Sequence, residues 1–318
     1  MLTHNIYLSG MKLEVLLEYK KQHPEAELNA LLSYGTRESN YPQMLITHRD
    51  KIGSLILDSG AFTKNISQSD RTAGITLPGY MAYLKYNYKY FDFAFTYDQD
   101  FNLDGFDTNY PIMKKIITAG YPVVPVVHDY IGEERDEISV YVEERHPIIA
   151  LGYSKHKKQN AIENIKKAIK PILAAGLKIH LLGLTSLEVH SNVPVHYSDS
   201  SSWAQEGLYG CTVWFNPNRA DKNFGQSRMY FKDRDKSSRD KATILDNHPD
   251  REVFLEYVNS QLGLTYEDLY GHFCDFNRQL VNVHYFIQLQ DKIREIHKDL
   301  IQKPEWSPYF QIEDNKTQ

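Results

Sequence analysis

Cysteine is nearly absent from this chain of 318 residues, which contains only Cys211 and Cys274. Two cysteines outside any Cys-x-x-Cys pair exclude a disulfide framework and a cysteine-rich zinc site. No apolar run approaches the roughly 18 residues of a membrane span. The first residues also lack the basic start and apolar core of a signal peptide. We therefore expect a cytoplasmic protein in a reducing compartment, without membrane association.

An excess of positive charge is missing as well. The formal net charge is -5, and charged residues make up 24% of the chain. Because a strongly basic surface is the electrostatic signature of general nucleic-acid binding, any such site here must be a local patch. Hydrophobic residues make up 42%, enough for one large core or two ordinary domains.

What the sequence does have is a regular alternation of apolar runs and amphipathic segments. Eight runs are typical of buried strands: Asn5–Leu8, Leu31–Tyr34, Ser54–Leu57, Phe93–Tyr97, Pro122–Val127, Ile148–Leu151, Lys178–Leu182 and Val193–Tyr197. Intervening helices are predicted over Lys12–Lys21, Leu77–Tyr90, Pro111–Ala119, Glu133–Glu144, Asn160–Ala175 and Ser186–His190. Such alternation predicts a parallel α/β sheet. Eight strands favour a closed TIM-type (β/α)8 barrel, with a doubly wound sheet as the alternative.

The character of the chain changes after Trp203. Tyr209–Phe215 is one more strand candidate, Asn216–Lys241 is polar and basic, and helices are predicted over Arg251–Leu262 and Thr265–Ile301. We predict a single domain over residues 1–318. It consists of a barrel over about 1–215, a basic insertion over about 216–241 and C-terminal helices over about 250–303, followed by a loosely ordered tail. The insertion is either a solvated loop or a phosphate-contacting patch that includes Arg228, Lys232 and Arg234.

Polar residues or glycines follow six successive strands of the predicted barrel. They are Asp58-Ser59-Gly60, Asp98-Gln99-Asp100, His128-Asp129, Gly152-Tyr153, Gly183 and Ser198-Asp199. One such residue could simply cap the next helix. Six in succession favour a site, because the carboxyl ends of barrel strands converge on the face that carries catalysis.

Two of these acids, Asp58 and Asp199, suit glycosyl transfer or hydrolysis. One carboxylate attacks or stabilises an oxocarbenium-like sugar carbon, and the other moves protons. A metal site is the rival use of the same residues, but His128 is the only strand-end histidine. His180 and His196 lie within strands, as hydrogen-bonded core residues often do. We expect neither a metal ion nor a cofactor.

In their order along the chain, these residues resemble the motifs of the tRNA-guanine transglycosylase family, which inserts queuosine and archaeosine precursors into tRNA. Leu57-Asp58-Ser59-Gly60-Ala61-Phe62 is similar to the family's Asp-Ser-Gly-Gly-aromatic strand end, with Ala61 in place of a glycine. The other similar segments are Tyr97-Asp98 at the base-recognising Asp, Ala150–Tyr153 at the Gly-Gly-Leu loop, His180–Leu184 at a Met-Gly strand end, Tyr197–Ser200 at the nucleophile, and Gln279–Phe286 in the C-terminal helix. The resemblance spans about Leu55 to Glu295.

This resemblance implies a role for each motif. Asp199 would be the nucleophile on C1′ that forms a covalent glycosyl-enzyme intermediate, and Asp58 would be the general acid/base. Asp98 would accept hydrogen bonds from the N–H edge of a guanine-like base, and Phe62 would stack on that base. The other base-binding residues would be His128, Leu182 and Gly183, together with the backbone of Gly152 and Tyr153 at the base's carbonyl oxygen. The nearby Lys155, Lys157 and Lys158 would hold backbone phosphates or, alternatively, form a solvated helix start.

Three departures from the family pattern matter. The cysteines of the family's zinc subdomain are missing, although His284 falls near its histidine, so no zinc subdomain is predicted. His128 stands where the family has a glutamine, which leaves the 7-substituent of the base open. The chain is also shorter than family members that act on tRNA. It is more similar to phage and bacterial relatives that exchange guanine in DNA for a 7-deazaguanine, so DNA is favoured over tRNA.

The resulting expectation is a pentosyltransferase in a bacterial or phage-infected cytoplasm, with nucleic acid and a 7-deazaguanine base as its partners. One alternative is a non-catalytic nucleic-acid-binding partner subunit, against which the retention of both Asp58 and Asp199 argues. Another is a nucleosidase or glycoside hydrolase that uses the same acid pair. The sequence leaves open whether the chain forms a homodimer.

Overall fold

The computed structural model of the chain describes residues 2–36, 41–66, 74–132, 134–152, 160–220, 223–232 and 244–310. The chain divides into two compact units. The first consists of Met1–Gly10, Leu28–Ser200 and Asp291–Gln318, and the second of Met11–Glu27 and Ser201–Gln290. The barrel unit therefore ends its main run at Ser200 rather than at about residue 215.

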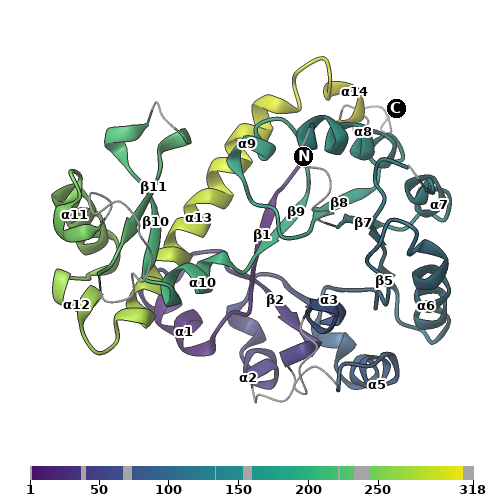
Figure 1. The fold of residues 1–318 in the computed structure, drawn as a ribbon, viewed down its shortest axis with the longest axis horizontal. Helices are drawn as coiled ribbons and strands as arrows, with labels where there is room; N and C mark the ends of the chain where they lie inside the picture. Colours follow the sequence, from purple (N-terminus) through teal and green to yellow (C-terminus); the bar gives the residue numbers. More distant parts are fainter. Residues whose placement is uncertain are drawn as a thin grey trace, which may run out of the picture. The chain divides into compact units, whose positions relative to one another are not determined.

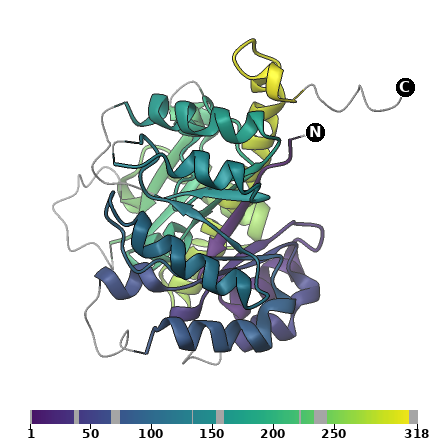
Figure 2. The same ribbon diagram turned by 90° about the vertical axis from the view of Figure 1, so that its right-hand side faces the viewer.

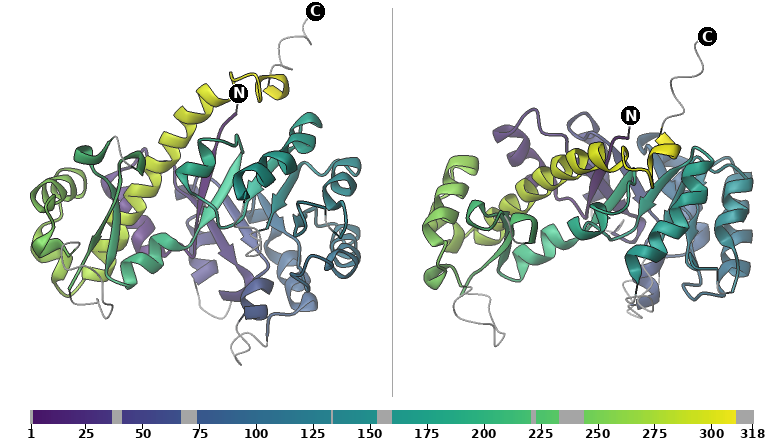
Figure 3. Two further views of the ribbon diagram at one scale, coloured as in Figure 1. Left: turned by 45° about the horizontal axis from the view of Figure 1, so that its top comes forward. Right: turned by 90° about the horizontal axis from the view of Figure 1, so that it is seen from above.

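The first unit is a parallel β-barrel (Figure 1). Its strands are β1 (Asn5–Ser9), β2 (Asn29–Ser33), β3 (Leu55–Asp58), β4 (Phe93–Phe95), β5 (Val123–Val124), β6 (Val126–Val127), β7 (Ile148–Leu151), β8 (Lys178–Leu181) and β9 (Tyr197–Ser200). They pair in the order β5-β4-β3-β2-β1-β9-β8-β7-β6, always in parallel. The pairing of the first strand with the last can be followed in Figure 3. The predicted TIM-type barrel is confirmed.

Pro125 explains why the predicted fifth strand appears as two short ones. A proline has no N–H to donate to a neighbouring strand. Before Pro125, the N–H of Thr96 donates to Val124 O at 3.0 Å, and after it the N–H of Ala150 donates to Pro125 O at 2.9 Å. The segment thus pairs with β4 through β5 and with β7 through β6, which brings the two edges of the sheet together in one stretch of chain.

Helices surround these strands on the outside (Figures 1 and 2). Those of the first unit are α2 (Tyr41–Thr47), α3 (Ala61–Ile66), α5 (Leu77–Asn87), α6 (Phe106–Thr118), α7 (Glu137–Glu143), α8 (Ala161–Ala174), α9 (Leu187–His190), the last part of α13 (Cys274–Leu300) and α14 (Ser307–Phe310). Local signals mark their starts. The side chain of Thr76 accepts the N–H of Gly79 at 3.2 Å, and that of Asp136 accepts the N–H of Ser139 at 3.1 Å.

The barrel interior is filled with apolar side chains. The cluster consists of Tyr7, Leu31, Ile56, Phe93, Phe95, Val124, Val126 and Ala150, with Ile148, Leu182 and Tyr197 packed against it. The imidazole of His180 lies among these rings, 5.0 Å from the centroid of Phe95 and 5.9 Å from that of Tyr7. Because the interior is packed, chemistry is confined to the strand ends.

Two predicted boundaries in the first unit are wrong. The last strand is Tyr197–Ser200 and not Val193–Tyr197. The apolar Val193 and Val195 are buried, but they lie in the segment that precedes the strand. The predicted loose tail is anchored as far as residue 310. Trp306 is fully buried, and Glu305 pairs with Lys170 at 3.1 Å.

The second unit combines a two-stranded antiparallel sheet with helices. Its elements are β10 (Cys211–Phe215), β11 (Gln226–Tyr230), α1 (Leu13–Gln22), α10 (Ser202–Leu208), α11 (Arg251–Leu262), α12 (Tyr266–Tyr270) and the first part of α13 (Cys274–Leu300). Asn282 on α13 links two of these elements: its Oδ1 accepts the N–H of Val213 at 2.8 Å, and its amide donates to Trp203 O at 3.0 Å.

Two predictions in the second unit need correction. The polar stretch after residue 216 includes a strand, because alternate residues of β11 such as Ser227 and Met229 turn inward. The predicted single helix over Thr265–Ile301 is two helices, α12 and α13, interrupted at Gly271. The predicted helix start at Thr265 is confirmed by a capping box with Asp268.

Three buried histidines pack together in the first unit. The ring of His4 lies 4.6 Å from that of His190 and 5.3 Å from that of His297. Burial lowers the pKa of His4 well below its usual value, that of His190 to about 3 and that of His297 to about 4, and charge repulsion from the neighbouring histidines adds to the effect at His4 and His190. The cluster therefore folds in its neutral form.

This cluster predicts a loss of stability in mild acid. Below pH 6.5 the histidines of the unfolded chain take up protons, whereas those of the folded cluster do not. The free energy of unfolding therefore has its full value above pH 6.5 and decreases as the pH falls below 6.5. Each histidine should cost about 2 kcal/mol at pH 5. Urea unfolding at pH 7.5 and 5.0 measures this loss. His297→Phe should reduce the difference between the two pH values by about a third, and an unchanged difference would contradict the assignment.

Candidate active site at the carboxyl ends of the barrel strands

The predicted site residues in the barrel do follow successive strands. Asp58 ends β3, Asp98 follows β4, His128 follows β6, Gly152 follows β7, Gly183 follows β8, and Asp199 lies inside β9. Because all these strands are parallel, their carboxyl ends lie on one face of the barrel. The structure therefore brings together residues that are far apart in the sequence.

Asp58 is held by two donors and carries a perturbed pKa. Its Oδ2 accepts the N–H of Gly60 at 2.7 Å and the hydroxyl of Ser33 at 3.3 Å. Burial raises the pKa of Asp58 to about 6, the hydrogen bond from Gly60 opposes the rise, and the negative charges of Asp199 and Asp98 add to it. A carboxyl group that titrates near neutral pH suits general acid/base catalysis.

The turn after Asp58 depends on Gly60. Gly60 has a φ of +73°, and a Cβ at this position would lie 2.6 Å from the backbone N of Gly35. The β3 end is thus pressed against the segment that follows β2. The N–H of Gly35 donates to Ser33 Oγ at 3.1 Å, which orients the hydroxyl toward Asp58.

Replacing Gly60 with alanine should therefore destabilise the protein by roughly 2–4 kcal/mol, through strain at positive φ and collision with backbone that cannot move aside. Gly176→Ala is the matched control, because Gly176 has a φ of +70° but nothing within 4 Å of an added Cβ. It should cost only about 1–2 kcal/mol. Equal losses in thermal or urea unfolding would show that contact with Gly35 contributes nothing.

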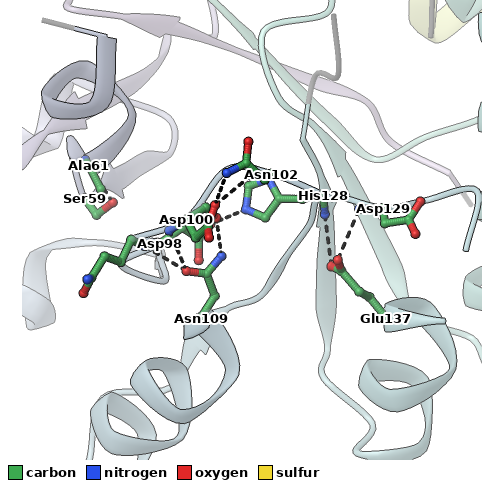
Figure 4. Close-up of polar contacts among 10 residues, drawn as sticks. Ser59, Ala61, Asp98, Asp100, Asn102, Asn109, His128, Asp129 and Glu137 are labelled. Carbon is green, nitrogen blue, oxygen red and sulfur yellow. Dashed lines mark hydrogen bonds and ion pairs between the residues drawn. The ribbon is translucent and has the colours of Figure 1, made fainter. Parts of the chain in front are cut away.

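Asp98 and His128 form a buried pair (Figure 4). Asp98 is only 4% exposed, and its Oδ2 lies 3.0 Å from Nε2 of His128. Burial by itself would lower the pKa of His128, but the hydrogen bond and charge of Asp98, with Glu137 and Asp100, raise it overall. Within the described ranges, Oδ1 of Asp98 has no hydrogen-bond partner. A buried carboxylate oxygen without a donor is costly, so it fits a site that receives an N–H group from a ligand.

Two polar residues inside helices hold the loops of this pair in place (Figure 4). Oδ1 of Asn109 on α6 accepts the N–H groups of Gln99 and Asp100 at 2.8 and 3.0 Å. The carboxylate of Glu137 on α7 accepts the N–H of His128 at 3.0 Å and that of Asp129 at 3.2 Å. Sequence reasoning missed Asn109 and Glu137, because a polar residue in a helix is ordinarily on its solvated face.

Asp129 follows His128 directly but has a local structural role. It is fully buried, and its carboxylate accepts N–H groups from Gly132 at 3.1 Å, Glu134 at 2.7 Å and Arg135 at 3.3 Å. It fixes the loop that leads into α7. Of the two residues at this strand end, His128 is therefore the one available to the site.

Asp199 forms a second pair, with His180. Oδ1 of Asp199 lies 2.9 Å from Nε2 of His180 and accepts the N–H of Gly183 at 3.0 Å. Asp199 is 8% exposed, and His180 is fully buried. The sequence marked His180 as a core residue, which it is, and gave no sign of its contact with Asp199.

The remaining base-binding predictions have mixed outcomes. The N–H of Gly152 donates to Val127 O at 2.9 Å, so this amide is not available to a base carbonyl. Leu182 is half-buried against the barrel core. Phe62 is 51% exposed, with its ring centroid 5.4 Å from that of Phe101. Phe101 in turn lies 5.4 Å from His128, a contact that sequence reasoning missed.

The predicted phosphate-contacting residues are only partly described. Tyr153, Lys155, Lys157, Lys158 and Arg234 lie outside the described residues. Arg228 and Lys232 belong to the second unit, where Arg228 pairs with Glu206 at 3.2 Å and Lys232 is exposed.

Metal ligation has little support in the described parts of the chain. They contain no group of three or more His, Cys, Asp or Glu side chains that could hold a metal ion. His284, which falls near the family's zinc ligand, instead lies with its Nδ1 2.8 Å from the hydroxyl of Tyr19. In the same parts of the chain, no helix is long and apolar enough to cross a membrane.

Fold and site together define a TIM-type barrel protein with three interacting carboxylates and two histidine–aspartate pairs at the face formed by the carboxyl ends of the strands. Comparisons with protein-family models and with curated proteins found no match to the chain. Function is therefore inferred from these side chains and from the order of the sequence motifs.

Proposed function

We propose that this protein is a base-exchange transglycosylase that replaces guanine in nucleic acid, with DNA favoured over tRNA, by a 7-deazaguanine. One observation carries the proposal. Asp58 and Asp199 lie on the same barrel face, close enough for the charge of Asp199 to raise the pKa of Asp58. Two such carboxylates are the catalytic groups that the cleavage and re-formation of a glycosidic bond require.

The proposed reaction has two balanced steps. In the first, the carboxylate of Asp199 attacks C1′, the C1′–N9 bond breaks, and the proton of Asp58 neutralises the departing guanine. In the second, the carboxylate of Asp58 removes the N9 proton of the incoming base, N9 attacks C1′, and the ester bond to Asp199 breaks. The chain ends the cycle in its starting state, with the configuration at C1′ retained.

Asp98 supplies the base recognition in this proposal. Guanine and 7-deazaguanine both present adjacent N–H donors, and a carboxylate is an acceptor-only partner for them. Oδ2 of Asp98 is engaged by His128 at 3.0 Å, so Oδ1 is the acceptor left for the base. Phe62 offers an exposed ring for stacking. To place a nucleotide of duplex DNA here, the protein must flip it out of the stack.

The direct test offers the protein guanine-containing DNA and tRNA separately, each with labelled guanine and with labelled 7-deazaguanine. Labelled guanine reports base exchange whatever 7-substituent the natural base carries. Uptake of label into DNA supports the proposal, and uptake into tRNA alone moves the substrate to tRNA. Release of free guanine without uptake identifies a nucleosidase or glycoside hydrolase. If neither polymer takes up label or releases guanine, the proposal is refuted.

A further inference from the structure

His180 combines full burial with a contact to one particular oxygen of Asp199. Its Nε2 lies 2.9 Å from Oδ1, the same atom that accepts the N–H of Gly183 at 3.0 Å. In the described part of the chain, Oδ2 of Asp199 has no hydrogen bond, and it retains some of the side chain's 12% exposure. Both donors thus converge on one carboxylate oxygen and leave the other open.

The surroundings of His180 determine how its proton is placed. Its Nδ1 has no hydrogen-bond partner among the described residues, and aromatic rings pack around the imidazole. In a neutral imidazole one nitrogen donates and the other accepts. A proton on Nε2 satisfies the carboxylate, whereas a proton on Nδ1 would place two acceptors against each other. We therefore assign the Nε2–H form.

We propose that His180 is a positioning residue that, together with the amide of Gly183, anchors Oδ1 of Asp199 and presents Oδ2 as the attacking oxygen. This inference rests on the proposed function, because it takes Asp199 as the nucleophile. It goes beyond that function by naming which oxygen attacks and which side chain selects it.

The same contact acts on the second step of the reaction. When the Oδ2–C1′ bond forms, Asp199 becomes a neutral ester and Oδ1 loses charge. When the incoming N9 displaces Asp199 from C1′, the carboxylate charge returns and is shared with Oδ1. Two donors already aimed at Oδ1 stabilise that charge as it develops, without reorganisation. His180 therefore makes Asp199 a better leaving group as well as a better-oriented nucleophile.

Variants of similar size at His180 distinguish the positioning role from a role in packing alone. His180→Phe keeps an aromatic ring in the cluster and removes the donor, whereas His180→Gln can return an N–H near the position of Nε2. Tyr197→Phe is the matched control, since the Tyr197 ring lies 6.2 Å from His180 and its hydroxyl faces Lys178 at 3.3 Å. We expect kcat to fall about 10²-fold in His180→Phe, to recover about tenfold in His180→Gln and to stay unchanged in Tyr197→Phe.

A measurement without turnover keeps the two proposals distinguishable. The ¹³Cγ chemical shift of Asp199, assigned through Asp199→Asn, reports the hydrogen bonds that its carboxylate accepts from Gly183 and His180. Loss of the His180 donor should change this chemical shift in His180→Phe but not in Tyr197→Phe.

The outcomes then divide clearly. A changed Asp199 chemical shift in a His180→Phe protein, when the wild type exchanges no base, would refute the proposed function but retain the anchoring contact. An unchanged chemical shift in His180→Phe, or a loss of kcat that His180→Gln does not recover, would overturn the positioning role even if base exchange is found.

Discussion

Asp199→Asn is expected to abolish base exchange, with a loss of at least about 10⁴-fold, while affinity for the nucleic acid stays within about twofold. An amide oxygen cannot form the ester to C1′, yet asparagine keeps the shape of the side chain. Its Oδ1 can still accept from His180 and Gly183, which donate to the same atom in the wild type. The structure around the nucleophile should therefore survive the substitution.

Two measurements check this result. Steady-state exchange of labelled guanine gives the loss of rate, and denaturing gels detect the covalent protein–nucleic acid adduct that the wild type should accumulate without an acceptor base. Asp107→Asn removes the same charge from an exposed site, where Asp107 pairs with Arg135 at 3.2 Å, and should exchange normally. Full exchange and adduct formation by Asp199→Asn would exclude Asp199 as the nucleophile. Binding without exchange in the wild type would point to the non-catalytic partner subunit.

Asp58→Asn should reduce exchange by about 10²–10⁴-fold and, at the same time, stabilise the protein. The activity falls because an amide cannot carry the proton between the leaving and incoming bases. The stability rises because the ionised carboxylate is unfavourable where Asp58 lies: burial raises its pKa from 3.8 to about 6 in the folded protein. Removal of a charge that function requires is a common source of added stability at active sites.

The pH dependence of that stabilisation follows from the direction of the shift. The folded state binds the Asp58 proton more tightly than the unfolded state, so the penalty is absent below pH 3.8, grows up to pH 6 and is constant above it. Urea unfolding should find the variant more stable by roughly 2–3 kcal/mol at pH 8, and by less at pH 5. A variant as stable as the wild type at pH 8 would show that ionised Asp58 carries no penalty.

Much of the barrel could be predicted from residue patterns, because strands and helices are encoded by periodicity over a few residues. The strand at Val193–Tyr197 is an instructive failure. Val193 and Val195 are as apolar and buried as strand residues, yet the strand begins at Tyr197. Burial alone does not distinguish a strand from a packed loop. Pairing with β1, through Asn5 and Tyr197, is what defines β9.

The sequence by itself determined which residues stand at the strand ends. Asp58, Asp98 and His128 follow from the alternation of strands and helices, since parallel strands direct all their carboxyl ends to one face. The requirement for glycine at Gly60 could also be predicted from the local sequence, because a sharp turn after a strand favours a residue that tolerates positive φ.

Only the tertiary structure decided how these side chains are paired. His128 meets Asp98 across 30 residues and His180 meets Asp199 across 19, and in each pair the oxygen that is engaged and the oxygen that stays open depend on strand register. Ser33, Asn109 and Glu137 act through the same kind of contact. Hydrogen bonds require distances and angles between distant segments, and no local pattern of residue types contains that information.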